Sequence, residues 1–148
     1  MASLTLTGAD VAKYILDKKG VMSAMKLHKL VYYSQAWSLV WDDEPLFNDA
    51  IEAWANGPVV RSLYNIHKGM YQVSVTTYAN YANNELSENQ KDTIDTVLEA
   101  YSGKSTQWLS DQTHSEQPWI IARRDLADNE RFDPVITLES MVEYYSAM

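Results

Sequence analysis

The feature that most constrains the fold is an apolar stretch, free of charged residues, between Lys29 and Asp42. It lies in a helix that we expect to run from about residue 24 to residue 41, capped by Ser23. On a helical projection most positions are apolar, and one narrow lane is polar: His28, Gln35, Ser38 and Asp42. A helix that is apolar on most sides is normally surrounded by other helices. We therefore place this helix at the centre of the fold.

A membrane-spanning helix is the competing interpretation of the same stretch. Such a helix needs about 20 consecutive apolar residues, whereas this run is shorter and includes Gln35 and two serines. The sequence therefore predicts a mainly α, compact single domain of about six or seven helices around a central apolar helix at about 24–41.

Capping residues and glycines mark the other helices. The predicted starts are Thr7 with Asp10, Ser87 with Gln90, Ser105, Pro118 and Thr137. The predicted stops include Gly20, Gly69 and Gly103. No repeat or long linker divides residues 1–148, so we expect one domain, with a polar connection at 128–134 and a closing helix at about 137–147.

Helical spacing also predicts which side chains face the core. We expect the following to point inward: Trp108, Leu109, Trp119, Ile120, Ala122, Leu138, Met141, Val142 and Tyr145. Arg123 and Arg124 are expected to point toward solvent.

A second informative stretch runs from Glu52 to Tyr64. Residues 50–54 are too short for a helix and can be extended, and Gly57-Pro58 then predicts a sharp turn. Because proline suits the first position of a helix, we expect a helix from Pro58 onward. Its apolar face would comprise Val60, Leu63, Tyr64 and His67, and Trp54 and Tyr64 would bracket the turn.

Residues 71–83 are rich in Val, Thr and Tyr with an approximate period of two. This pattern is consistent with a short strand that pairs with residues 50–54 as a two-stranded β ribbon. An irregular excursion is the alternative, because Asn and Ala interrupt the pattern.

The net charge of −8 is unevenly distributed. Residues 1–31 contain five Lys and two Asp, whereas residues 32–148 contain seven Lys or Arg and eighteen Asp or Glu. An acidic body repels phosphate backbones, so nucleic acid is an unlikely partner. The same charge favours a basic protein partner, although plain solubility explains it equally well.

The sequence also suggests where the protein resides. The N-terminal residues show no basic start followed by an apolar core, so we expect no secretory signal. The lack of cysteine suits a reducing compartment. We therefore expect a soluble cytoplasmic protein with no membrane association.

The search for catalytic motifs gives negative results. Without cysteine the chain has no disulfide, thiolate zinc site or cysteine nucleophile, and it contains no HExxH, phosphate-loop or Gly-x-Ser-x-Gly motif. We expect no cofactor and no metal. The acidic run Asp42-Asp43-Glu44 is interpreted as a solvated turn rather than a metal site. His114 is interpreted as a cap at a helix C-terminus, with a reactive or ligand-binding role as the alternative.

Several motifs follow one another in a fixed order along the chain: Lys26-Leu27-x-Lys29-Leu30-x-Tyr32-Tyr33-x-Gln35-Ala36-Trp37, Pro45-Leu46-Phe47, Ile51-Glu52-Ala53-Trp54-x-x-Gly57-Pro58-Val59-Val60-x-x-Leu63-Tyr64, Thr113-His114 and Pro118-Trp119. This ordered series resembles the Panacea domain, the SocA-like antitoxin family that also includes phage-associated, GepA-like proteins. The resemblance spans about residues 8–125. The closing helix lies outside it.

This resemblance implies a helical, bacterial antitoxin of a toxin–antitoxin system that neutralises its cognate toxin by direct protein contact, the toxin being encoded by a neighbouring gene. The matching residues have structural or partner-binding roles: Lys26, Tyr32, Gln35, Trp37, Trp54, Gly57, Pro58, Arg61, Tyr64, His114 and Trp119. Most of them are what a shared scaffold would need.

Several alternatives remain open. An adaptor that delivers a bound protein to a cellular protease is one, and an enzyme of unrecognised type with His114, Glu52 and Arg61 near Trp54 is another. A homo-oligomer is also compatible with the sequence. A DNA-binding autoregulator is disfavoured by the acidic body, although a basic patch can be drawn from Lys13, Lys18, Lys19, Lys26 and Lys29.

Overall fold

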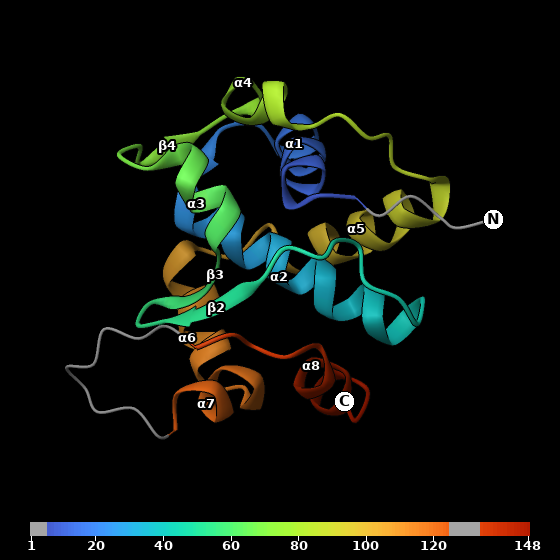
Figure 1. The fold of residues 1–148 in the computed structure, drawn as a ribbon, viewed down its shortest axis with the longest axis vertical. Coiled ribbons are helices and arrows are strands. Elements are labelled where there is room, and N and C mark those ends of the chain that lie inside the picture. Colours follow the sequence, from blue (N-terminus) through green and yellow to red (C-terminus); the bar gives the residue numbers. More distant parts are fainter. Residues whose placement is uncertain (1–5, 125–133) are drawn as a thin grey trace.

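Helix α2 (Ala24–Trp41) passes through the middle of the molecule, in the computed structural model that describes residues 6–124 and 134–148 (Figure 1). Its bounds and its Ser23 cap confirm the prediction. In the view of Figure 1, α1 (Gly8–Lys19), α3 (Arg61–His67) and α4 (Val75–Tyr78) lie on one side of it. Helices α6 (Thr106–His114), α7 (Gln117–Arg123) and α8 (Leu138–Tyr145) lie on the other.

The remaining elements complete a mainly α domain. Helix α5 (Glu88–Tyr101) packs along α2, and a 3₁₀ turn, η1 (Ala79–Tyr81), follows α4. Strands β2 (Ile51–Trp54) and β3 (Gly57–Val60) form one antiparallel pair, and β1 (Met22–Ser23) and β4 (Gln72–Val73) form another. The described residues thus hold eight α-helices and two small sheets, which confirms the fold class.

Local capping signals are confirmed. Thr7 and Asp10 form a capping box at α1, Ser87 and Gln90 form one at α5, and the hydroxyls of Ser105 and Thr137 cap α6 and α8. These signals were readable because each depends on residues close together in the chain.

The polar lane of α2 binds the backbone of the segments that follow it. The Nδ1 atom of His28 accepts a hydrogen bond from the Val60 amide at 3.1 Å. The side chain of Gln35 accepts a hydrogen bond from the Leu46 amide and donates one to the Phe47 carbonyl, each at 2.8 Å. Leu46 and Phe47 are consequently buried loop anchors. The lane therefore holds the loop and the β2–β3 hairpin against α2 instead of facing water.

The prediction of a helix from Pro58 is wrong. Residues 57–60 pair with residues 51–54 as a hairpin, and α3 begins only at Arg61. The β-branched residues Val59 and Val60 are fully buried, and strand pairing with burial satisfies their preference for extended backbone. Of the predicted extended segment 50–54, residues 51–54 form β2, whereas the predicted turn at Gly57-Pro58 lies two residues earlier, at Ala55-Asn56, and Gly57 and Pro58 belong to β3.

The predicted strand in residues 71–83 exists, but the proposed partner was wrong. Gln72 and Val73 pair with Ser23 and Met22, because β2 already pairs with β3. Ser74 then opens α4 through a capping box with Thr77.

Several predicted orientations are also corrected. Trp108, Leu138 and Val142 are exposed, and Arg123 is half-buried because its Nη1 donates to the Ala53 carbonyl at 2.7 Å. Leu109, Met141 and Tyr145 are buried as predicted, and Trp119, Ile120 and Ala122 are half-buried. Lys29 is buried, so the basic patch drawn from sequence loses one of its members.

Two further findings concern the connection predicted at 128–134 and the competing prediction of a membrane-spanning helix. The polar connection predicted at 128–134 falls outside the described residues apart from Pro134. Within residues 6–124 and 134–148, no helix is both long enough and apolar enough to cross a membrane.

Candidate functional site

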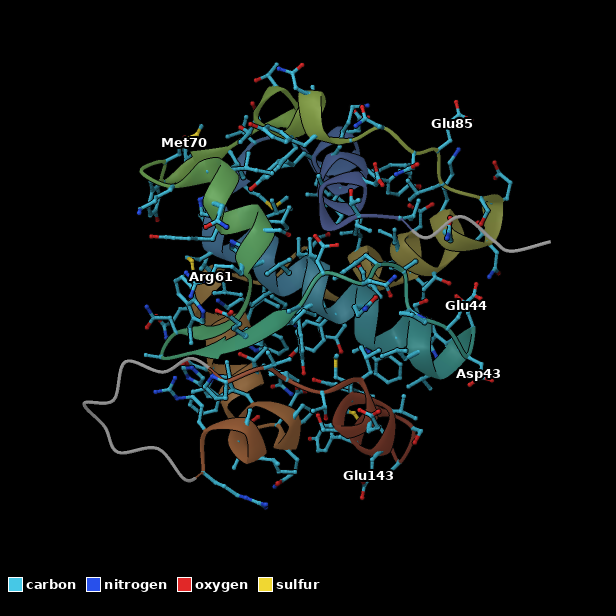
Figure 2. All side chains as sticks on the ribbon, viewed as in Figure 1. Asp43, Glu44, Arg61, Met70, Glu85 and Glu143 are labelled. Atoms are coloured by element: carbon cyan, nitrogen blue, oxygen red, sulfur yellow. The ribbon has the colours of Figure 1, made fainter. Side chains whose placement is uncertain are left out.

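The β2–β3 hairpin and the start of α3 bring together an aromatic and charged cluster at the surface, which we call the hairpin cluster: Glu52, Trp54, Arg61 and Tyr64. The Oε1 atom of Glu52 accepts hydrogen bonds from Trp54 Nε1 at 2.9 Å and Arg61 Nε at 3.1 Å. The Arg61 guanidinium lies 4.9 Å from the centroid of the Trp54 ring, which also contacts Tyr64 edge to face. Arg61 is exposed beside the hairpin (Figure 2).

Side chains of α6 and α7 hold the hairpin that carries this cluster by hydrogen bonds to its backbone. Trp119 Nε1 donates to the Trp54 carbonyl at 2.8 Å, and Ser110 Oγ donates to the Asn56 carbonyl at the hairpin turn at 2.8 Å. Helices α6 and α7 therefore hold the hairpin from behind. The cluster contains large rings with polar tips and an arginine, which are the side-chain types enriched at protein interfaces.

His114 lies behind this surface and does not cap its own helix. The C-cap of α6 is Ser115, while the His114 ring packs on Trp119 with centroids 4.2 Å apart. Its Nε2 atom is buried without a hydrogen-bond partner among the described residues. Burial lowers the pKa of His114, and the nearby Lys29 charge lowers it further, so the ring is favoured in its neutral form.

The enzyme hypothesis required His114, Glu52 and Arg61 to converge near Trp54. Glu52 and Arg61 do meet beside Trp54, as an ion pair of 3.0 Å. His114 contacts Trp119 and the backbone of Ala55, on the side of the hairpin that α7 holds.

Lys29 occupies the interior between α2 and the hairpin. A Cβ atom placed on Gly57 would lie 2.8 Å from Lys29 Cε and 3.1 Å from Thr113 Oγ1, so the absence of a side chain at Gly57 makes room for the lysine. Among the described residues, Lys29 Nζ has no hydrogen-bond partner. Burial lowers the pKa of Lys29 to about 8, because desolvation disfavours the charged ammonium.

Two buried histidines form a pair on the other side of α2. His28 Nε2 lies 2.7 Å from His67 Nε2, and the Val60 amide donates to His28 Nδ1. Burial lowers the pKa of both rings. The pair therefore joins α2 to α3 as neutral imidazoles.

A buried carboxylate anchors α8, and no sequence signal pointed to it. Glu116 Oε1 accepts hydrogen bonds from the hydroxyls of Tyr33 and Tyr145, each at 2.7 Å, and the Tyr32 hydroxyl lies 2.9 Å from the Tyr145 hydroxyl. Burial raises the pKa of Tyr33 and Tyr145, and the adjacent Glu116 charge acts in the same direction. These hydroxyls thus remain donors that hold Glu116 and α8 against α2.

We expect Tyr145→Phe to destabilise the protein by about 2 kcal/mol, because it removes one of the hydroxyls that solvate a buried carboxylate. Tyr144→Phe is the matched control, since Tyr144 is half-buried and its hydroxyl makes no hydrogen bond within the described residues. Urea unfolding followed by tryptophan fluorescence measures the free energy of unfolding of both variants. An equal decrease in the two variants would contradict a role for the Tyr145 hydroxyl.

The other predicted site residues have structural contacts. Lys26 Nζ donates to the Ser102 carbonyl at 2.7 Å, and Trp37 Nε1 donates to the Tyr101 hydroxyl at 3.2 Å. Tyr32 and Gln35 are buried in the contacts already described, and Pro58 lies buried within β3.

The acidic turn after α2 does not bring its carboxylates together with other possible metal ligands within the described residues. Asp42 accepts a hydrogen bond from the Thr93 hydroxyl, whereas Asp43 and Glu44 lie in the turn without forming a cluster of ligands. Across residues 6–124 and 134–148, no group of three His, Cys, Asp or Glu residues is placed to hold a metal ion.

The protein is thus a mainly α domain that carries an aromatic and charged cluster at its surface. A family model described as "Antitoxin SocA-like, Panacea domain" matches residues 27–120. The chain therefore belongs to the SocA-like antitoxin family with a Panacea domain. No curated protein and no solved structure matches it.

Proposed function

We propose that this protein is the antitoxin of a toxin–antitoxin system and neutralises its cognate toxin by direct protein–protein binding, without being an enzyme. Membership of an antitoxin family is the observation that carries the proposal. The toxin would be encoded by a neighbouring gene, and both proteins would act in the cytoplasm. The acidic surface, with a net charge of −8, would speed association with a basic partner.

The predicted site residues divide into two groups under this proposal. Trp54, Arg61 and Tyr64 are accessible enough at the surface to contact a partner. The others support the scaffold through the contacts described above: Lys26, Tyr32, Gln35, Trp37, Gly57, Pro58, His114 and Trp119.

Co-expression with the neighbouring open reading frame tests the proposal. We expect the neighbour alone to arrest growth, this protein to relieve the arrest, and the two proteins to co-purify as a stable complex. Growth arrest that this protein fails to relieve, with no complex recovered, would contradict the antitoxin function.

The same strain distinguishes plain neutralisation from the alternative, an adaptor that delivers the toxin to a protease. Neutralisation by binding predicts that the half-life of the toxin is unchanged or longer when this protein is present. An adaptor predicts a shorter half-life that is restored in cells lacking the responsible protease. A chase experiment with a tagged toxin measures the difference.

A further inference from the structure

Helix α8 has one buried face and one unpartnered apolar face. Met141 and Tyr145 point into the core, whereas Leu138 and Val142, one helical turn apart, are 40% and 38% exposed. Leu138 and Val142 therefore form a short apolar ridge on the surface, which we call the α8 ridge. Apolar side chains grouped on one surface are a common sign of an interaction site.

Hollows lie on both sides of α8, and Leu138 of the α8 ridge lines one of them. The larger hollow, of about 450 Å³, lies between α7 and α8 and is lined by Ile121 and Tyr144 among others. The second, of about 290 Å³, lies between α8 and the loop before β2, and Ile51 and Val135 contribute to its wall. The α8 ridge and the two hollows together offer an apolar groove system along the α7–α8 face.

The charged side chains that line the hollows all carry a negative charge. The charged side chains that line these hollows are Asp49, Glu139 and Glu143. Glu139 and Glu143 are one helical turn apart and exposed, and Glu143 projects away from the body of the molecule (Figure 2). A partner suited to this face must supply apolar side chains for the hollows and positive charges for the rim.

The face is also held in place before any partner arrives. Tyr145 fixes α8 to Glu116 and Tyr32 through its hydroxyl, and the Ile136 amide donates to the Ile51 carbonyl at 2.8 Å just before α8 begins. A preorganised surface binds with less loss of conformational entropy.

The family match ends at residue 120, so Ile121 and the whole of α8 lie beyond it. The elements that the family model describes form the scaffold, and the α7–α8 face is built largely from residues that follow them. That placement suits a surface that selects one particular partner.

We propose that the α7–α8 face is the docking surface for an amphipathic, basic α-helix of the cognate toxin. This inference rests on the proposed antitoxin function and names the surface and the chemistry of the partner. The helix lies along the α8 ridge, places apolar side chains at spacings of three and four residues against the ridge and into the hollow that Leu138 lines, and sets Lys or Arg against Glu139 and Glu143.

The first experiment uses charge reversal and a defined probe. A labelled helical peptide of about 18 residues, with leucine and lysine in an amphipathic pattern, is titrated with the protein, and fluorescence anisotropy reports binding. We expect Glu139→Lys/Glu143→Lys to weaken binding at least tenfold. Glu85→Lys/Glu99→Lys carries the same change in net charge on exposed residues, Glu85 away from this face (Figure 2) and Glu99 on α5, and we expect it to change affinity less than threefold. Equal weakening by both pairs would overturn the proposal.

A second pair of variants removes the apolar contacts. Leu138→Ser/Val142→Ser should weaken peptide binding at least tenfold, whereas Val21→Ser, at a residue that is 63% exposed elsewhere, should not. Circular dichroism and thermal unfolding establish that each variant is folded. If the ridge variant keeps full affinity, or if it converts a dimer of this protein to a monomer in sedimentation experiments, the face is not a toxin-docking surface.

The growth assay separates this inference from the proposed function. If the wild-type protein relieves the arrest and the charge-reversed and ridge variants relieve it equally well, the docking surface is wrong while the antitoxin function stands. If the wild-type protein gives no relief, the antitoxin function fails and so does the assignment of the toxin as partner. The expected result is relief by the wild-type and control proteins and loss of relief in both α8 variants.

Discussion

Replacing Lys29 by methionine is expected to stabilise the protein by about 3 kcal/mol at pH 7. Methionine keeps the length and apolar character of the lysine stem but removes the ammonium group. In the native protein that group is buried without a hydrogen-bond partner among the described residues, and its pKa falls to about 8. An unpaired buried charge is among the most costly features of a protein interior.

The pH dependence of this stabilisation follows from the direction of the shift. The pKa of Lys29 is about 8 in the folded protein, against 10.5 for an unperturbed lysine. Below pH 8 Lys29 is protonated in both the folded and the unfolded protein, so the folded protein bears the full free-energy cost of burying the charge. As the pH rises from 8 toward 10.5, the folded state releases the proton first, so the wild-type protein gains stability. The advantage of Lys29→Met should therefore shrink by roughly 2 kcal/mol between about pH 7 and pH 9.5.

Urea unfolding of both proteins at the two pH values measures the effect, and taking the difference between them cancels the titration of other groups. Lys19→Met, at an exposed position on α1, should stay within about 0.5 kcal/mol of wild type at both pH values. A second readout is the pKa of His114, which should rise in Lys29→Met because the burial of the ring remains but the lysine charge is gone. A destabilised Lys29→Met variant would show that Lys29 Nζ has a partner in solution.

The sequence predicted the features that depend on neighbouring residues. Helix α2 and its Ser23 cap were readable because an uncharged run and a capping serine are local signals. The start of α3 could not be predicted in this way, because Gly57-Pro58 taken alone fits the opening of a helix. The outcome was decided by pairing with β2 and by burial of Val59 and Val60 against α2, which are tertiary effects.

The difference between local and long-range contacts also explains which parts of the candidate site could be predicted from the sequence. Glu52, Trp54 and Arg61 are close in sequence, so their convergence was foreseeable. Glu116 lies 83 positions from Tyr33 and 29 from Tyr145, and no periodicity connects such distant residues. Lys29 was assigned to a basic surface patch because charged side chains are almost always exposed. Its burial depends on the space left by Gly57, which the sequence alone does not reveal.

Gly57→Ala is expected to destabilise the protein by roughly 3 kcal/mol, for two separate reasons. Gly57 has a φ of +121°, a conformation that side-chain-bearing residues rarely adopt. The added Cβ would also lie 2.8 Å from Lys29 Cε, and the lysine cannot move aside easily because it is fully buried. Gly103→Ala is the control, since a Cβ added there would meet no atom within 4 Å and the φ of Gly103 is not positive.

A double-mutant cycle separates the two causes of the Gly57→Ala defect. Lys29→Ala removes the lysine atoms that the new Cβ would meet, but it leaves Thr113 Oγ1 and the backbone conformation unchanged. If the close approach to Lys29 contributes, Gly57→Ala should cost at least about 1 kcal/mol less in the Lys29→Ala background than in the wild type, as urea unfolding would measure. An equal cost in both backgrounds would assign the defect to the backbone at Gly57 and to the contact with Thr113 Oγ1, and not to Lys29. A cost below about 1 kcal/mol in the wild type would show that the hairpin turn can rearrange, and Gly57 would then not be required to admit the buried lysine.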